Sequence, residues 1–200
     1  MGMCMVLHSL SDQNILRIQT EPELIWRLIA ADDPDAYLQA VQKKNRSGIW
    51  ARLFGQAKVS PPELVSLSYA DGENVDIDLD KSWQGIHYCL NETAYDAESP
   101  MDFITLGGEE AGTVEVGYGP ARLFDSPTVG EISALLHDIS AEQFKANYDP
   151  QRMQKLDIYP NIWEREGDDG FEYIAEYYNI LKQFINHCSN HQLGMAIYLC

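Results

Sequence analysis

The sequence predicts a single α+β domain, rich in helices, around a small sheet that includes short N- and C-terminal strands. Three observations predict this class. Short apolar segments occupy residues 3–8 and 195–199, and several capped helix signals lie between them. The chain has 200 residues, 45% of them hydrophobic, which is enough for a folded core. Because the two terminal segments share an apolar character, we expect them to pair with each other.

Helix signals follow the first predicted strand. Residues 12–18 form a short helical segment. Thr20 and Glu23 then have the spacing of a capping box, in which Thr20 would be the N-cap and Glu23 would bond back to it. Asp33-Pro34 marks a further start, because proline fits the first turn and the Asp oxygen accepts its free N–H groups. The chain after the first strand is therefore predicted to be a helical region.

A change of charge sets residues 36–62 apart. This stretch holds five bases and no acid, whereas the rest of the chain holds 9 bases and 31 acids. We interpret it as a basic insertion at about residues 40–60, either a helical hairpin or a loop that lies over the acidic body. Its bases are Lys43, Lys44, Arg46, Arg52 and Lys58, and the apolar side chains that need a surface to bury against are Trp50, Leu53 and Phe54.

The rest of the chain alternates strand and helix signals. Residues 74–78 predict an edge strand or an extended lead-in, and residues 79–91 predict a helix. Residues 96–116 are rich in Gly and Glu and are predicted to be mostly loop. The remaining elements are a strand at 121–124, a helix from Ser126-Pro127 to about His137, a capping box formed by Ser140 and Gln143, a helix start at Asp149-Pro150 and a long helix at 170–189.

The net charge of −17 argues against affinity for nucleic acid or anionic membranes, since both need clustered Lys and Arg. The charge suits either an ordinary acidic protein or one that attracts a basic partner. We find no signal peptide and no apolar run long enough to span a bilayer, so we expect a cytoplasmic location. Four widely spaced cysteines without a CxxC pair predict reduced thiols rather than a disulfide framework. No motif predicts a cofactor.

The stretch DIDLDKSWQGIHYCL, residues 76–90, begins with an acid at every second position. A calcium loop does not fit, because Lys81 stands where the loop needs glycine and His87 where it needs a bidentate Glu. A helix fits better, since the apolar residues recur at helical spacing and an aspartate lies at the N-terminal end. His87 follows Trp83 by one turn, at the margin of the apolar stripe. It is interpreted either as a satisfied, half-buried histidine or as an imidazole that faces a ligand.

Two glycine-bearing stretches, LGGEE and GYGPAR, predict turns with close backbone approach. Arg122 in the second stretch has the fork of donors that suits a carboxylate or phosphate, so the two loops form a candidate anion site. In the alternative interpretation they are tight turns, and Arg122 bonds a nearby Glu or a backbone carbonyl. The other candidate residues in these stretches are Gly107, Gly108, Tyr118 and Gly119.

One histidine pair has a spacing that zinc can use. His187 and His191 lie four residues apart on the long C-terminal helix. However, the Glu of a metalloprotease motif is missing, and the helix is expected to end near residue 190. We therefore predict no metal site.

A series of short segments runs through the chain in a set order. They are the start MGM, DLDKSWQGIHY, LGGEE, YGPAR, the run from Val129 through IS and YDP to IYPNIW, and the closing G-x-A-I-x-L. Together they resemble the YfbM-like family of uncharacterised bacterial proteins, over nearly the whole chain except about residues 40–60. The resemblance implies a bacterial protein with one α+β domain. It implies no reaction and assigns no catalytic residue.

Two functional hypotheses from different classes follow. The first is a non-catalytic interaction protein, such as an immunity-type inhibitor of a basic toxin, since acidic charge speeds association with a basic partner. The alternative is a small-molecule-binding enzyme with a pocket between the 79–91 helix and the two glycine-bearing loops. In that pocket His87 would be the acid–base group, Arg122 the anion clamp, and Trp83 or Tyr118 a stacking wall. We rank the interaction protein first.

Overall fold

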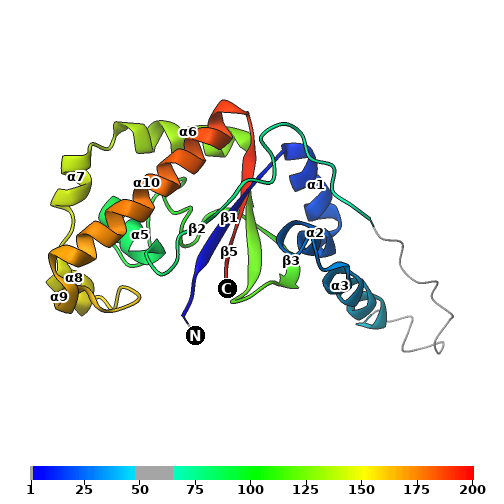
Figure 1. Ribbon diagram of the computed structural model, residues 1–200, viewed down its shortest axis with the longest axis horizontal. Helices are drawn as coiled ribbons and strands as arrows, with labels where there is room; N and C mark the ends of the chain where they lie inside the picture. Colours follow the sequence, from blue (N-terminus) through cyan, green and yellow to red (C-terminus); the bar gives the residue numbers. More distant parts are fainter. Residues whose placement is uncertain (1, 48–64) are drawn as a thin grey trace.

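The framework of the molecule is a five-stranded antiparallel sheet (Figure 1), and the computed structural model describes residues 2–47 and 65–200. The strands are β1 (Met5–Leu10), β2 (Asp76–Asp78), β3 (Glu109–Glu115), β4 (Pro120–Phe124) and β5 (Gly194–Leu199). They lie across the sheet in the order β2-β1-β5-β4-β3. The two terminal strands therefore form the centre of the sheet, and β2 and β3 form its edges.

The pairing of the terminal strands is direct. β1 and β5 run antiparallel, from Met5 opposite Leu199 to Leu10 opposite Gly194, which confirms the pairing expected from the sequence. Successive side chains of a strand point to opposite faces. Alternate residues of β5 accordingly enter two different apolar clusters, one on each face of the sheet.

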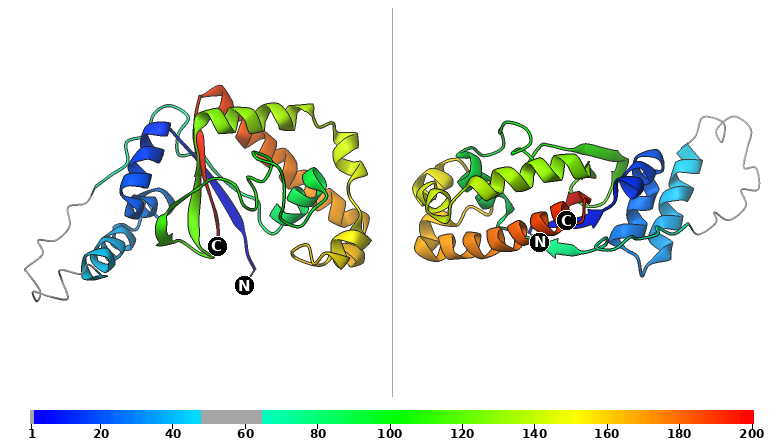
Figure 2. Two further views of the ribbon diagram at one scale, coloured as in Figure 1. Left: turned by 180° about the vertical axis from the view of Figure 1, so that it is seen from behind. Right: turned by 90° about the horizontal axis from the view of Figure 1, so that it is seen from above.

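Helices cover both faces of the sheet (Figures 1 and 2). On one side lie α1 (Asp12–Thr20), the 3-10 turn η1 (Pro22–Leu24), α2 (Ile25–Ile29) and α3 (Pro34–Ser47). On the other side lie α5 (Trp83–Asn91), α6 (Ser126–Asp138), α7 (Ala141–Ala146), α8 (Pro150–Lys155), α9 (Trp163–Glu166) and α10 (Asp168–Asn190). This arrangement confirms the predicted α+β class. Within residues 2–47 and 65–200, no helix is both long and apolar enough to cross a membrane.

Two local predictions are wrong, each for a physical reason. Thr20 is not an N-cap, because its hydroxyl donates to Leu16 O (2.8 Å) at the end of α1. The helix predicted from residue 79 begins at Trp83, since Asp80 has a positive φ of 46° that a helix does not allow. The segment 96–116 is mostly loop, as predicted, but its end forms β3, which was not predicted. That strand lacks regular alternation and contains a register shift, so its pattern gave no strand signal.

Other local predictions are confirmed. Ser140 and Gln143 form the capping box of α7, with both reciprocal bonds present. A helix starts at Asp149-Pro150, and another covers residues 126 to 138, although Asp125 rather than Ser126 is its N-cap. Of the basic insertion expected at about residues 40–60, the structure describes only the part on α3, where Lys44 pairs with Glu23 at 2.9 Å. The expected apolar residues of that segment, Trp50, Leu53 and Phe54, lie outside the described residues.

Candidate functional site

The two candidate residues on α5 both point into the protein. Trp83 is 4% exposed, donates from Nε1 to Met3 O at 3.2 Å and stacks on Tyr159. His87 is fully buried rather than half-buried. Its Nδ1 lies 3.4 Å from Thr105 Oγ1, and its Nε2 lies 3.4 Å from Thr93 Oγ1. Both ring nitrogens thus have partners from within the chain, which fits the interpretation of a satisfied histidine.

Burial lowers the pKa of His87 to about 4 from its ordinary 6.5, so the imidazole is neutral at pH 7. Between these two pH values the unfolded chain binds more protons than the folded one, so stability is full above about pH 6.5 and is lost as the pH falls. From pH 7.5 to pH 5 this residue accounts for a loss of about 2 kcal/mol. Urea unfolding at both pH values measures the loss.

The matched control uses an exposed histidine, His137. The His87→Gln variant is expected to show a smaller drop in stability between pH 7.5 and 5 than the wild type, whereas His137→Gln keeps the wild-type drop. Comparing variants matters because buried His8, whose pKa is also lowered by burial, adds a loss in the same direction. An unchanged drop in His87→Gln contradicts a neutral, buried imidazole.

The guanidinium of Arg122 is occupied by the backbone. Nη1 donates to Phe103 O (3.0 Å) and to Gly107 O, and Nη2 donates to Ile104 O (2.7 Å). Burial lowers the pKa of Arg122 to about 10, while the nearby Asp102 carboxylate acts in the opposite direction, so the side chain stays charged at neutral pH. The sequence left open whether Arg122 binds an anion, a nearby Glu or a backbone carbonyl. In the structure it bonds backbone carbonyls. Arg122 therefore fixes the loop at residues 102–107.

The two glycine-bearing stretches meet only at one end, where Arg122 pairs with Glu110 across β3 and β4 and donates to Gly107 O, and their turns are not brought together. The first ends where β3 begins, and the second forms the β3–β4 turn, so the seven residues of β3 separate them by about 20 Å. Tyr118 is 57% exposed, and its N–H donates to Leu199 O (2.9 Å). A Cβ added at Gly119 would meet nothing within 4 Å. The turn at residues 117–119 therefore lies beside the end of β5, away from the turn at Gly107 and Gly108.

Steric contacts explain why both positions 107 and 108 of the first loop are glycine. A Cβ at Gly107 would lie 2.6 Å from Asp102 Oδ1, and Gly108 has a φ of 93° that side chains rarely adopt. A Cβ at Gly108 would also lie 2.7 Å from the Phe124 ring. The glycine pair thus lets the loop lie close to Asp102 and to the end of β4.

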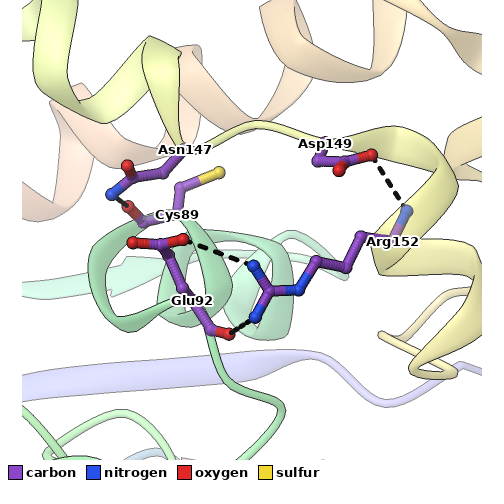
Figure 3. A network of polar contacts seen from close by, with 5 residues as sticks. All are labelled: Cys89, Glu92, Asn147, Asp149 and Arg152. Atoms are coloured by element: carbon purple, nitrogen blue, oxygen red, sulfur yellow. Dashed lines mark hydrogen bonds and ion pairs between the residues drawn. The ribbon is translucent and has the colours of Figure 1, made fainter.

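The end of α5 that follows His87 is anchored to α8, as Figure 3 shows. Arg152 donates to the carbonyl oxygen of Glu92 (3.3 Å) and forms an ion pair with its carboxylate (3.4 Å). Asn147 Nδ2 donates to Cys89 O (2.8 Å), and Asp149 accepts from Arg152 N as the N-cap of α8. These bonds satisfy carbonyls near the C-terminus of α5 and hold that end of the helix against α8.

Asp102 and Gly108, at the two ends of the loop that Arg122 fixes, line part of an acidic cleft of about 550 Å³. We call this the acidic cleft; it lies where the starts of α1 and α6 meet the end of β4. Its carboxylates are Asp12, Asp102, Glu109 and Asp125, and its apolar surface comes from Ile15, Leu16, Pro100, Leu123, Phe124 and Pro127. Gln19, Ser99, Gly108 and Thr128 complete the lining. No Lys or Arg belongs to it, and neither His87 nor Arg122 does.

Hydrogen bonds hold three of the carboxylates in place. Asp12 accepts from the backbone N (2.8 Å) and the hydroxyl (2.7 Å) of Ser126, which joins α1 to α6. Asp125 Oδ1 accepts from Thr128 N (3.0 Å), and Glu109 Oε2 accepts from Gln19 Nε2 (2.7 Å). Such bonds reduce the conformational freedom that a ligand would otherwise have to remove.

The fourth carboxylate has an unused acceptor. Asp102 Oδ1 is buried and has no hydrogen-bond partner among residues 2–47 and 65–200. A buried acceptor without a donor costs about 1–3 kcal/mol. This oxygen is closed to solvent, so the attraction of the cleft for N–H donors comes from its four carboxylates together.

Helix dipoles reduce the negative charge of the acidic cleft without cancelling it. The N-terminal ends of α1 and α6 each contribute about half a positive charge. Four carboxylates against about one positive charge from the dipoles, together with the Arg122 guanidinium near Asp102, leave the cleft at about −2. With the carboxylates and the nearby positive charges both counted, the cleft stays negative and attracts cations.

A second hollow, of about 680 Å³, lies between α2, α3 and β3. Its lining includes Lys43 and Lys44, but also Glu23 and Glu115, and Lys44 pairs with Glu23 at 2.9 Å. The charges of this hollow therefore balance. It offers no comparable attraction to a charged ligand.

The histidine pair His187 and His191 bonds the backbone. His187 Nε2 lies 2.8 Å from Gly72 O, and His191 Nδ1 lies 2.9 Å from His187 O. A Cβ at Gly72 would lie 2.7 Å from the His191 ring. In the part of the chain that the structure describes, no group of three or more His, Cys, Asp or Glu side chains could hold a metal ion.

Most residues of the acidic cleft were missed in the sequence, and only Gly108 was a candidate. One signal was present in the sequence. Leu16 is an apolar residue that lies off the helix face formed by Ile15 and Ile18, the two buried apolar residues of α1. In the structure Leu16 is 63% exposed. Asp12 and Asp125 each stand at the start of a helix, where an acid has a purely local reason. Their contribution to a common cleft depends on contacts between segments more than 100 residues apart.

Two comparisons find similar proteins. The sequence model of a family described as a domain of unknown function (DUF1877) matches residues 1–198. The crystal structure of YfbM from Escherichia coli, a protein of unknown function, is similar with a TM-score of 0.59 and 13% sequence identity, and the match covers 98% of this chain and 99% of that chain. At that identity the likeness shows the fold alone. A search of curated proteins gives no match.

Proposed function

Because the chain belongs to the family described as a domain of unknown function (DUF1877), as its sequence segments predicted, we propose a function from the chain's own surface. The protein is a non-catalytic interaction protein whose acidic cleft binds a basic segment of a protein partner. The observation that carries the proposal is the set of four carboxylates around an apolar floor, with no Lys or Arg in the lining. An immunity-type inhibitor of a basic toxin, acting in the cytoplasm, is one form of this function.

The chemistry of the acidic cleft suits arginine or lysine next to an apolar residue. A guanidinium donates to carboxylates in a bidentate manner, and its methylene stem packs on apolar surface. Leu16, at 63% exposure, offers an anchor for an apolar side chain of the partner. The net charge of −17 adds long-range attraction, so association is expected to weaken as salt is added.

The second candidate is a small-molecule-binding enzyme with a pocket near His87 and Arg122. Two observations count against it. The donors of Arg122 that would hold an anion bond the carbonyls of residues 103, 104 and 107. His87 is fully buried, and neither residue lines the acidic cleft. The cleft itself supports a binding role better than a catalytic one.

The test compares charge reversals inside and outside the acidic cleft. The probe is the peptide acetyl-Gly-Arg-Leu-Arg-Gly-amide, whose affinity is measured by titration at low salt. Glu109→Lys is expected to raise the Kd at least about fivefold, because it replaces an attractive charge with a repulsive one. Leu16→Ser is expected to raise it about threefold through the loss of apolar contact.

Matched controls change the same residue types elsewhere. Glu172→Lys alters an exposed acid of α10, and Leu135→Ser alters an exposed leucine of α6. Both are expected to change the Kd less than about twofold. Equal effects of Glu109→Lys and Glu172→Lys would mean that the peptide senses only the net charge, and the proposed function would then be rejected.

A further inference from the structure

Cys4 and Cys200, 196 positions apart in the sequence, lie opposite each other at the ends of the two central strands. Cys4 N donates to Cys200 O at 2.8 Å, and Cys200 N donates to Cys4 O at 2.9 Å. These bonds extend the β1–β5 ladder by one residue beyond the Met5–Leu199 pair. Figure 1 shows the two chain ends on the same side of the molecule.

The two thiols have a geometry that a disulfide can span. In an antiparallel pair that exchanges both backbone bonds, the Cα atoms lie about 5.5 Å apart and the side chains share one face. Disulfides join residues whose Cα atoms are roughly 4.4–6.8 Å apart. Their Cβ atoms must approach more closely than in the reduced pair, and the residues lie just beyond the ends of the strands, where small shifts disturb few bonds.

We propose that Cys4 and Cys200 form a redox modification site, closed to an intramolecular disulfide by a low-molecular-weight disulfide such as oxidised glutathione. The Cys200 thiolate attacks a sulfur of oxidised glutathione, forms a mixed disulfide and releases one glutathione thiolate. The Cys4 thiolate then attacks the Cys200 sulfur and releases the second. Two protons leave the protein thiols, two electrons reduce the oxidant, and one S–S bond replaces another.

Exposure sets the order of these steps. Cys200 is exposed and Cys4 is half-buried, whereas Cys89 and Cys188 are buried. Cys4 Sγ lies 3.4 Å from Asp80 Oδ1. Burial raises the pKa of the Cys4 thiol, with added effects from Asp80 and Asp78, and burial likewise raises that of Cys200. The thiolate fraction at neutral pH is therefore small, and oxidation is expected to be slow rather than spontaneous.

The bond would close nearly the whole chain into a ring and clamp the two central strands of the sheet. A cross-link between residues far apart in the sequence stabilises chiefly by restricting the unfolded chain. The oxidised protein is expected to unfold at a Tm roughly 5–10 °C higher than the reduced protein.

The experiment treats the full, purified chain with oxidised glutathione at pH 8.5 and maps its disulfides by mass spectrometry after digestion with pepsin. The expected product is a monomer lighter by two hydrogens, with Cys4 and Cys200 in one linked peptide and the raised Tm. Cys4→Ser and Cys200→Ser are each expected to abolish both changes, whereas Cys89→Ser keeps them.

Two outcomes would overturn the proposal. One is a reaction that stops at glutathione on Cys200, because Cys4 then does not reach it. The other is a product linked mainly between two chains or through Cys188. Neither outcome bears on peptide binding in the acidic cleft, so this test and that of the proposed function fail independently.

Discussion

Replacement of Arg122 by leucine is expected to lower the free energy of unfolding by about 2–4 kcal/mol. The variant leaves three backbone carbonyls of the loop at residues 102–107 without donors, and it leaves Asp102 without a neighbouring positive charge. Hydrogen bonds from a charged donor are worth about 1.5–3 kcal/mol each. The half-buried position of Arg122 keeps the expected total below the simple sum.

Urea unfolding at pH 7.5 measures this loss, and Arg152→Leu is its matched control. Arg152 also bonds a backbone carbonyl and a carboxylate, but its side chain is 50% exposed, so its removal is expected to lower stability by less than about 1 kcal/mol. Arg122→Leu should also weaken peptide binding, because the loop that carries Asp102 and Gly108 is no longer fixed. A loss of stability below 1 kcal/mol in Arg122→Leu contradicts its role as a loop anchor.

Replacement of Trp163 by alanine is expected to cost about 3–5 kcal/mol, the largest effect of any single substitution considered. Trp163 is fully buried and donates from Nε1 to Ile158 O at 2.7 Å. Its ring packs so closely on α5 that a Cβ at Gly85 would lie 2.8 Å from it. The substitution therefore opens a cavity and also removes one of the two donors to Ile158 O, which keeps its bond from Asn161 N (2.8 Å).

Thermal and urea unfolding of Trp163→Ala and Trp163→Phe measure the two parts of this loss. Phenylalanine fills part of the space but offers no N–H donor, so its loss is expected to lie between that of alanine and zero. Gly85→Ala should destabilise the protein as well, because the new methyl group meets Trp163 and Ile174. Equal stabilities of Trp163→Ala and wild type would show that the ring does not join α5, α9 and α10.

Local signals predicted much of the fold because their causes are local. The capping box at Ser140 depends only on residues four positions apart at most, and the apolar terminal segments show as strands without their partners. β3 gave no such signal, because its pairing with β4 includes a register shift and four of its seven residues are acidic or glycine. The true start of α5 depends on Asp80, whose carboxylate accepts from Tyr173 on the distant α10 at 2.8 Å.

The candidate site was predicted less well, because it is made of long-range contacts. The sequence singled out His87 and Arg122 for their chemistry, but their partners Thr105 and the carbonyls of residues 103–107 decide their roles. Trp83, on the apolar stripe that predicted the helix, is only 4% exposed and packs inward. No pattern in one segment shows that Asp12 and Asp125 flank the same cleft.

The central claim is that the acidic cleft, and not the acidic surface at large, binds a basic segment. Titration of ¹⁵N-labelled protein with the acetyl-Gly-Arg-Leu-Arg-Gly-amide peptide, followed by amide chemical shifts, tests it most directly. The account predicts saturable shifts in the segments 12–19, 99–109 and 123–128, which contain the residues that line the cleft. Comparable shifts at the acid-bearing segments 76–80 and 168–176, or shifts that do not saturate, would contradict it.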